Sequence, residues 1–121
     1  MAELKDPDAH RHGGIKDGSC AGCHDAHGGD RQLHLSKNYS RLFYQRYSAA
    51  NYGLCFSCHK SELVEQTQTT TATGFRNGEQ NLHALHVRDT EHRGQNCRVC
   101  HSTHAGPNDK IVREGTTYGA W

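Results

Sequence analysis

The sequence Cys20-Ala-Gly-Cys23-His24 has two close copies in the chain, Cys55-Phe-Ser-Cys58-His59 and Cys97-Arg-Val-Cys100-His101. Together the three copies use all six cysteines of the 121 residues. C-x-x-C-H is the attachment signature of a c-type haem, in which both thiols join the vinyl groups and the histidine coordinates the iron. On a helical turn, residues i, i+3 and i+4 share one face, so all three side chains reach one porphyrin. The sequence therefore predicts three covalently bound haems.

Two other kinds of site use paired cysteines, and the spacing argues against both. Two of the C-x-x-C pairs would complete a four-cysteine zinc site, which leaves the third pair unused. Zinc also gives no reason for a histidine after every second cysteine, an arrangement that chance would produce roughly once in a thousand sequences. A redox-active dithiol is typical of a strand-helix-strand pattern, which the sequence around the motifs lacks.

The composition is too polar for an ordinary protein core. Leu, Ile, Val and Phe together number 17 of 121 residues, below the roughly 20% at which a chain becomes able to bury a core. Ordering the chain costs on the order of 1.5 kcal/mol per residue. Three haems would supply the missing apolar surface. We therefore expect a mostly irregular and α-helical fold, with short helices packed around three haems and little or no sheet.

Charge and hydropathy exclude several classes of partner. The net charge is +1, with 14 basic and 13 acidic residues, so neither a nucleic acid nor an anionic membrane surface is favoured. No apolar run approaches the 18 or so residues of an integral membrane span. Covalent haem attachment takes place outside the cytoplasm. We therefore expect a periplasmic or extracellular protein whose export signal is not present in this numbering.

Two terminal segments are predicted to lack regular structure. Residues 1–19 are polar and rich in Asp, His and Gly, which is typical of a flexible arm. Gly115 and Gly119 favour an extended tail over residues 110–121. The whole chain, residues 1–121, is predicted to form one domain.

Two helices are predicted between these segments. Asn51 is placed to cap a helix that carries the second motif from Leu54 and continues to Glu65. Asn77 and Gln80 have the spacing of a capping box. They predict a second helix, on which the residues of one stripe are Leu82, Leu85, His86 and Asp89.

The first and third motifs belong to a longer internal repeat. Each is preceded by a glycine and followed, three residues after the motif histidine, by a second histidine, His27 or His104. The second motif has Ser61 and Glu62 in that region instead. The sequence therefore predicts that sites one and three are equivalent and that site two differs from them.

Histidines are the predicted sixth ligands of the irons. The only methionine is Met1, at the terminus, which effectively excludes methionine ligation. Subtracting the three motif histidines from the eleven in the chain leaves eight candidates for three positions. About half of these must therefore be ordinary surface side chains. The candidates are His10, His12, His27, His34, His83, His86, His92 and His104.

The chain resembles the doubled-CxxCH multihaem c-type cytochromes. The resemblance lies in C-x-x-C-H-x-x-H at sites one and three, in Leu54-Cys55-Phe-Ser-Cys58-His59, and in the run from Gly74 to Val87 ahead of the last site. It covers residues 12 to about 121. It implies electron transfer rather than enzymatic activity, with other redox proteins as partners. Some members polymerise into haem-stacked filaments, so identical subunits are also implied as partners.

The resemblance also implies a ligand set. In that family the histidine upstream of a motif usually caps the same haem, and the trailing histidine caps the neighbouring one. By this rule His12 caps the haem at His24, His27 the haem at His59, and His86 the haem at His101. His104 is left over, and we expect it to serve a haem outside this chain. Two alternatives stay open, namely His10 in place of His12 and His83 in place of His86.

Bis-histidine ligation decides which function we expect. Such a haem has no open coordination position and, without methionine, a low potential, so it passes electrons without binding substrate. One alternative is a haem enzyme that keeps an open position for a small nitrogen or sulfur oxyanion. A structural subunit of a haem-stacked filament is the other.

Overall fold

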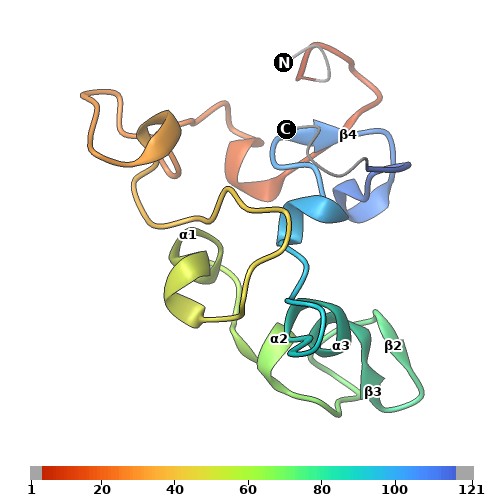
Figure 1. Cartoon of the computed structure of the whole chain (residues 1–121). Helices are drawn as coiled ribbons and strands as arrows, with labels where there is room; N and C mark the ends of the chain where they lie inside the picture. The colour runs from red at the N-terminus through yellow and green to blue at the C-terminus, as the bar shows by residue number, and fades with distance from the viewer. Residues whose placement is uncertain (1–3, 117–121) are drawn as a thin grey trace.

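The structure is a computed structural model and describes residues 4–116. Most of these residues lie in loops and turns between short elements (Figure 1). The helices are α1 (Gly53–Phe56), α2 (Glu62–Glu65) and α3 (Leu82–Val87). The strands are β1 (His10–Arg11), β2 (Arg76–Asn77), β3 (Gln80–Asn81) and β4 (Ala105–Gly106). Short 3-10 turns cover Gly13–Ile15, Gln32–His34, Ala49–Tyr52, Cys97–Val99 and Asp109–Ile111. The predicted mixture of short helices and irregular chain is confirmed.

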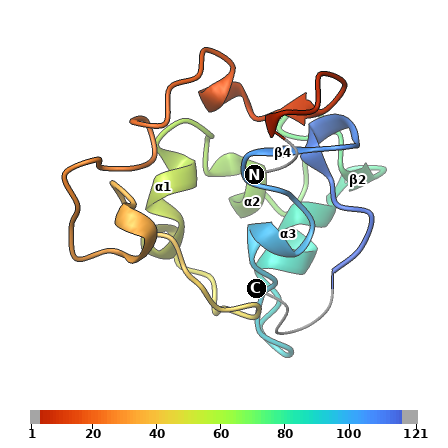
Figure 2. The same cartoon turned by 90° about the horizontal axis from the view of Figure 1, so that it is seen from above.

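The four strands form two small antiparallel sheets. β1 pairs with β4, with His10 opposite Gly106 and Arg11 opposite Ala105. Figure 2 shows this pairing, which brings the N-terminal arm against the segment that follows the third motif. β2 and β3 form a hairpin in which Gly78, with φ of 59°, occupies the tight turn. A positive φ costs glycine little, which explains its place there.

Helix α3 begins at a cap that differs from the predicted one. The Asn81 side chain accepts hydrogen bonds from the backbone N–H groups of His83 and Ala84, at 2.9 and 3.3 Å. The prediction of a capping box at Asn77 and Gln80 is wrong, because those residues face each other at the turn of the β2–β3 hairpin. A local pattern of residue types could not show that the chain doubles back there before the helix starts.

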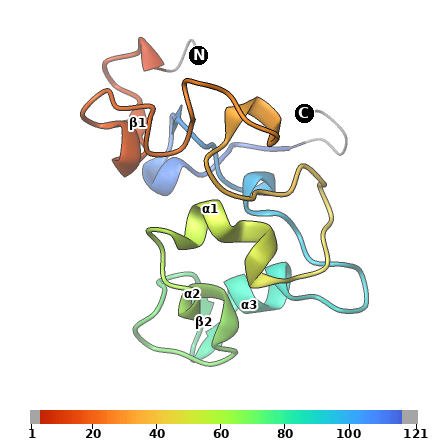
Figure 3. The same cartoon turned by 90° about the vertical axis from the view of Figure 1, so that its left-hand side faces the viewer.

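The second motif lies on a helix that ends earlier than predicted. The continuous helix expected from Leu54 to Glu65 is divided into α1 and α2, with a turn between them. The predicted cap at Asn51 is also wrong, since this residue lies in the 3-10 turn that precedes α1. The break lets α2 pack beside α3, as Figure 3 shows.

The core is a small aromatic cluster between α1, α2 and α3. Its fully or nearly fully buried members are Tyr52, Val64 and Val87, with Tyr52 at 0% exposure. Tyr47 stacks on Tyr52 at a centroid distance of 6.2 Å. Partly buried neighbours complete the cluster, namely Tyr39, Tyr47, Phe56, Leu63 and Cys97. The low apolar content therefore appears in the fold as one limited cluster adjoining the second and third motifs.

The N-terminal segment contacts the segment that follows the third motif. In the arm predicted to be flexible, residues 10–11 form β1, and the backbone N–H of His12 donates to the carbonyl of His104 at 2.8 Å. The start of the predicted tail lies in the 3-10 turn Asp109–Ile111. Met1 and residues 117–121 lie outside the described part of the chain. Between residues 4 and 116, no helix is long and apolar enough to cross a membrane.

Candidate functional site

The first and third motifs have the same local structure. In each, the motif histidine N–H donates to the carbonyl of the first cysteine, at 2.9 Å for His24 and 3.0 Å for His101. In each, the ring Nδ1–H donates to a backbone carbonyl nine residues further on. His24 bonds to Leu33 at 2.8 Å, and His101 bonds to Lys110 at 2.9 Å. The sequence repeat is therefore also a structural repeat, as predicted for these two sites.

A strained turn positions the two carbonyls. Leu33 and Lys110 have φ of 53° and 55°, and the residue after each, His34 or Ile111, is also left-handed. Non-glycine residues seldom adopt this conformation, and such strain clusters at functional sites. Matching backbone hydrogen bonds hold each loop against its motif: Asp25 to His34 and Ser36 to Cys23 at site one, Ser102 to Ile111 and Arg113 to Cys100 at site three.

This loop orients the motif imidazole. A histidine whose Nδ1–H donates to a carbonyl presents its Nε2 as a lone-pair donor, the usual arrangement of a metal-ligating histidine. His24 and His101 both have this arrangement. They are therefore prepared, by their own following loops, to coordinate a metal through Nε2.

Three pairs of imidazoles face each other across the molecule, and each pair contains one motif histidine. His24 faces His104 with ring centroids 6.2 Å apart and planes at 16°. His59 faces His12 at 6.0 Å and 17°. His101 faces His83 at 6.3 Å and 21°. All three sites of the chain thus have a second imidazole at nearly the same distance.

The spacing of the pairs matches that of two axial ligands. Imidazoles bound at about 2.0 Å on opposite sides of one metal ion have ring centroids about 6 Å apart. The observed distances of 6.0, 6.2 and 6.3 Å agree with this value. The donor set of two thiols and two imidazoles at each site therefore fits a covalently attached haem.

The pairing differs from the one that the resemblance implies. The structure places His12 at His59 rather than at His24, and it places His104 at His24 rather than leaving it over. At the third site the second imidazole is His83, the alternative that the sequence left open beside His86. The β1–β4 pairing brings the segments of His12 and His104 together, and no sequence signal indicated this pairing.

Two histidines of the implied ligand set lie outside these pairs. His27 is exposed, and its backbone N–H donates to Asp25 Oδ1 at 2.9 Å. His86 is exposed too, with its Nδ1–H bonded to the carbonyl of Leu82 at 2.7 Å and its ring stacked on Phe75. The structure does not bring either ring to a motif histidine.

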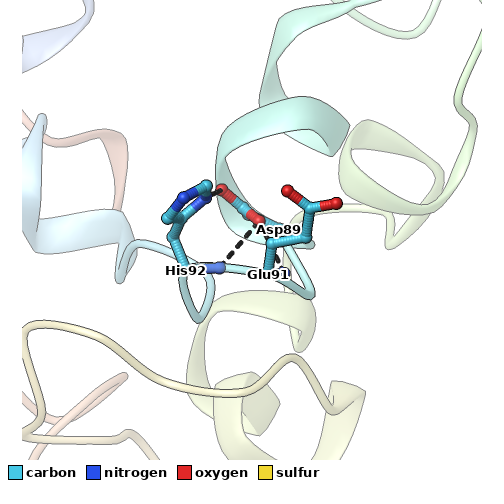
Figure 4. Close-up of polar contacts among 3 residues, drawn as sticks. All are labelled: Asp89, Glu91 and His92. Carbon is cyan, nitrogen blue, oxygen red and sulfur yellow. Dashed lines mark hydrogen bonds and ion pairs between the residues drawn. The ribbon is translucent and has the colours of Figure 1, made fainter.

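The rings of the remaining candidates are not paired with a motif imidazole within residues 4–116. His10 is exposed on β1. His92 ends a turn after α3, where its Nδ1–H donates to Asp89 at 3.1 Å (Figure 4). Backbone N–H groups of His92 and Glu91 also donate to Asp89, and the bond from His92 is the main reason that the pKa of this carboxyl is lowered. His34 lies in the strained turn after the first motif.

His12 and His83, the imidazoles that face His59 and His101, are partly buried, and their surroundings favour the neutral form. Burial lowers the pKa of His12, and the nearby His59 and His104 lower it further. Burial also lowers the pKa of His83, with smaller contributions from His101 and His86. The His83 ring shares a 3.1 Å hydrogen bond with the Thr73 hydroxyl through Nδ1. Both shifts favour the neutral imidazole, which is the form that a metal ligand requires.

The second and third attachment sites touch each other. The Cys55 thiol lies next to Cys97, and this neighbour together with burial raises the pKa of Cys55. Between these sites lies the buried Tyr52, whose pKa is raised by burial and by both cysteines. Its hydroxyl has no hydrogen-bond partner within residues 4–116. A buried hydroxyl is normally bonded, so this orphaned donor is consistent with a group that occupies the space between the two sites.

Comparison with known proteins adds one match. Residues 12–63, which contain the first two motifs and begin at His12, match a family model described as the doubled CXXCH motif. No curated protein and no solved structure matches the chain.

Proposed function

Because residues 12–63 carry the doubled CXXCH motif of multihaem c-type cytochromes, we propose that the chain is a triheme electron-transfer protein with two histidine ligands on every iron. The observation that supports the proposal is the set of three imidazole pairs, with centroids 6.0, 6.2 and 6.3 Å apart. The proposed axial pairs are His24 with His104, His59 with His12, and His101 with His83. The thioethers are formed by Cys20 and Cys23, Cys55 and Cys58, and Cys97 and Cys100.

In this proposal the protein supplies the ligands of each iron, holds the imidazoles in position and leaves no coordination position for a substrate. A bound haem supplies a one-electron iron couple, which two imidazoles without methionine keep at low potential. The carbonyls of Leu33 and Lys110 hold the motif imidazoles of sites one and three in place. A second imidazole at each site leaves no position for a substrate. This arrangement favours electron transfer over a haem enzyme that acts on a nitrogen or sulfur oxyanion.

The proposed location is the periplasm or the cell exterior, where multihaem c-type cytochromes typically work. The proposed partners are other redox proteins or identical subunits in a haem-stacked assembly. We propose His104 as the second ligand of the haem at His24, so it is no longer left for a haem outside this chain. His104 faces His24, whereas the ring of His27, its counterpart in the repeat, is not paired with a motif histidine within residues 4–116. Because the three imidazole pairs already supply both ligands of every proposed haem, the assembly form needs no histidine from a neighbouring subunit.

The test is to produce the chain with a c-type cytochrome maturation system and to count its haems. We expect three covalent haems per chain by mass, reversible one-electron reduction of each at low potential, and no turnover of nitrite or sulfite. Carbon monoxide should bind the reduced protein slowly, because a histidine must first leave the iron. Fewer than three haems, or immediate binding of carbon monoxide, would contradict the proposal.

A further inference from the structure

Two of the second imidazoles are joined through the backbone. His12 faces His59 and His104 faces His24, so they serve different sites. Yet the His12 N–H donates to the His104 carbonyl at 2.8 Å, directly beside the β1–β4 pairing. We call the paired segments, residues 10–12 and 104–106, the distal ribbon. The second imidazole of site three belongs to α3 instead, outside this ribbon.

The distal ribbon is held mainly by backbone contacts. Both residues of β1 are exposed, whereas both residues of β4 are buried. Gly106 packs against Ser102 on the other side of β4, where a Cβ would lie 3.3 Å from the Ser102 hydroxyl. Strands of two residues are too short to be stable alone. The pairing therefore depends on what its two histidines bind, and the positions of the histidines depend on the pairing.

We propose that the distal ribbon is a shared clamp that couples the axial ligands of the first and second haems. This inference rests on the proposed function, since it requires haems at these sites. When His12 leaves its iron, the ribbon loses one anchor and His104 becomes easier to release, and the converse holds equally. Coupling of this kind is reciprocal for binding equilibria. The third haem, with His83 on α3, lies outside the coupling.

The coupling can be tested with a small haem ligand that competes with the distal histidine for the iron. Release of a distal imidazole is measured by the binding of carbon monoxide to the reduced irons. If the two sites are coupled, the first and second haems become accessible to carbon monoxide together, and the third does not. Independent clamps would give three unrelated rates.

A matched pair of substitutions at His10 separates the ribbon from the ligands. His10 faces Gly106, and in antiparallel pairing the residue two positions from His12 is the next one that bonds to its partner. His10→Pro removes the backbone N–H of β1 and leaves His12 and His104 in the chain. His10→Ala removes only an exposed side chain. The two variants therefore differ in the ribbon and share the loss of the imidazole.

The experiment measures carbon monoxide binding by the reduced, fully loaded variants, with bound ligand counted by mass spectrometry. In His10→Pro we expect two haems to bind about five- to tenfold faster than in wild type, as for the loss of one backbone hydrogen bond. His10→Ala should match wild type. Equal rates in the two variants, acceleration of a single haem, or acceleration of all three would overturn the clamp.

A second measurement covers the case in which His10→Pro does not fold. His12→Ala should raise the carbon monoxide affinity of the first haem, and His104→Ala should raise that of the second by a similar factor. His83→Ala should change neither. Unchanged affinities in the first two variants would overturn the coupling while leaving the triheme proposal intact. A wild type with fewer than three low-spin haems would instead refute the proposed function.

Discussion

The end sites and the middle site hold their motif histidines by different means. At the first and third motifs, a loop that follows in sequence turns back and accepts the imidazole Nδ1–H, through Leu33 or Lys110. At the second motif, the ring of His59 has no hydrogen bond within residues 4–116, and the motif instead begins on α1, where Phe56 packs against the aromatic cluster. The end sites are therefore organised locally, and the middle site depends on distant parts of the chain.

This difference shows what a repeated motif does and does not determine. The segments that follow the first and third motifs differ in sequence, yet each contains two left-handed residues at the same offset and forms the same loop. The second motif has the same C-x-x-C-H sequence, but it packs against the cluster around Tyr52. The imidazole that faces its histidine belongs to His12, which is distant in the sequence. The four predictions below test this division.

The largest expected effect is on stability when the middle haem is removed. Cys55→Ser with Cys58→Ser should destabilise the loaded protein by several kcal/mol, because Cys55 adjoins Tyr52 and Cys97 in the core. The matched variant, Cys20→Ser with Cys23→Ser, should cost clearly less. Thermal unfolding followed by circular dichroism makes the comparison. Equal losses of stability in the two variants would mean that the middle site contributes no more to the fold than the first site does.

The next effect is on the spin state of the first haem. His104→Ala should convert one of three haems to high spin, because His104 faces His24 at 6.2 Å. The control is His27→Ala, at the equivalent position of the other repeat, which should stay fully low-spin. Electron paramagnetic resonance of the oxidised proteins reads both. The reverse outcome would restore the ligand set implied by the family resemblance.

A similar comparison applies to the third haem. His83→Ala should produce one high-spin haem, whereas His86→Ala, one turn further along α3, should not. The reason is that the Nδ1 of His83 is bonded to Thr73 and its ring faces His101, while His86 is exposed. The visible spectrum of the oxidised proteins separates the variants. A high-spin signal in His86→Ala alone would reassign the ligand.

The smallest effect concerns the strained turns that only the end sites have. Leu33→Gly and Lys110→Gly should each raise the free energy of unfolding by about 1 kcal/mol, because their φ of 53° and 55° suits glycine. Leu33 is 68% exposed, so little packing is lost. Lys16→Gly, at φ of −56°, is the control and should lower stability slightly. Denaturant titration of the loaded protein would disprove this if the end-site variants behaved like the control.

The sequence predicted the local chemistry well and the long-range pairing poorly. The C-x-x-C-H spacing and the trailing histidine were enough to predict that sites one and three are alike, because their structure is formed within one continuous segment. The imidazole that faces His59 could not be predicted from the sequence. It depends on the pairing of β1 with β4, and strands of two residues are too short to show an alternating pattern in the sequence.

The same limit explains the two errors in the helices. Asn77 and Asn81 are both plausible caps by residue type, and only the hairpin between them decides that Asn81 caps α3. The break between α1 and α2 likewise reflects packing of α2 on α3. The Asn81 side chain, at the start of α3, donates 2.8 Å hydrogen bonds to the backbone carbonyls of Leu63 and Gln66. Tertiary contacts, rather than propensity, set these boundaries.

The most direct measurement of the central claim is the spin state and axial ligation of the oxidised, fully loaded protein, by electron paramagnetic resonance together with near-infrared magnetic circular dichroism. Three imidazole pairs predict three low-spin haems, all with the charge-transfer band of bis-histidine ligation. A high-spin signal, or any haem with a different second ligand, would contradict the pairing of His24 with His104, His59 with His12 and His101 with His83.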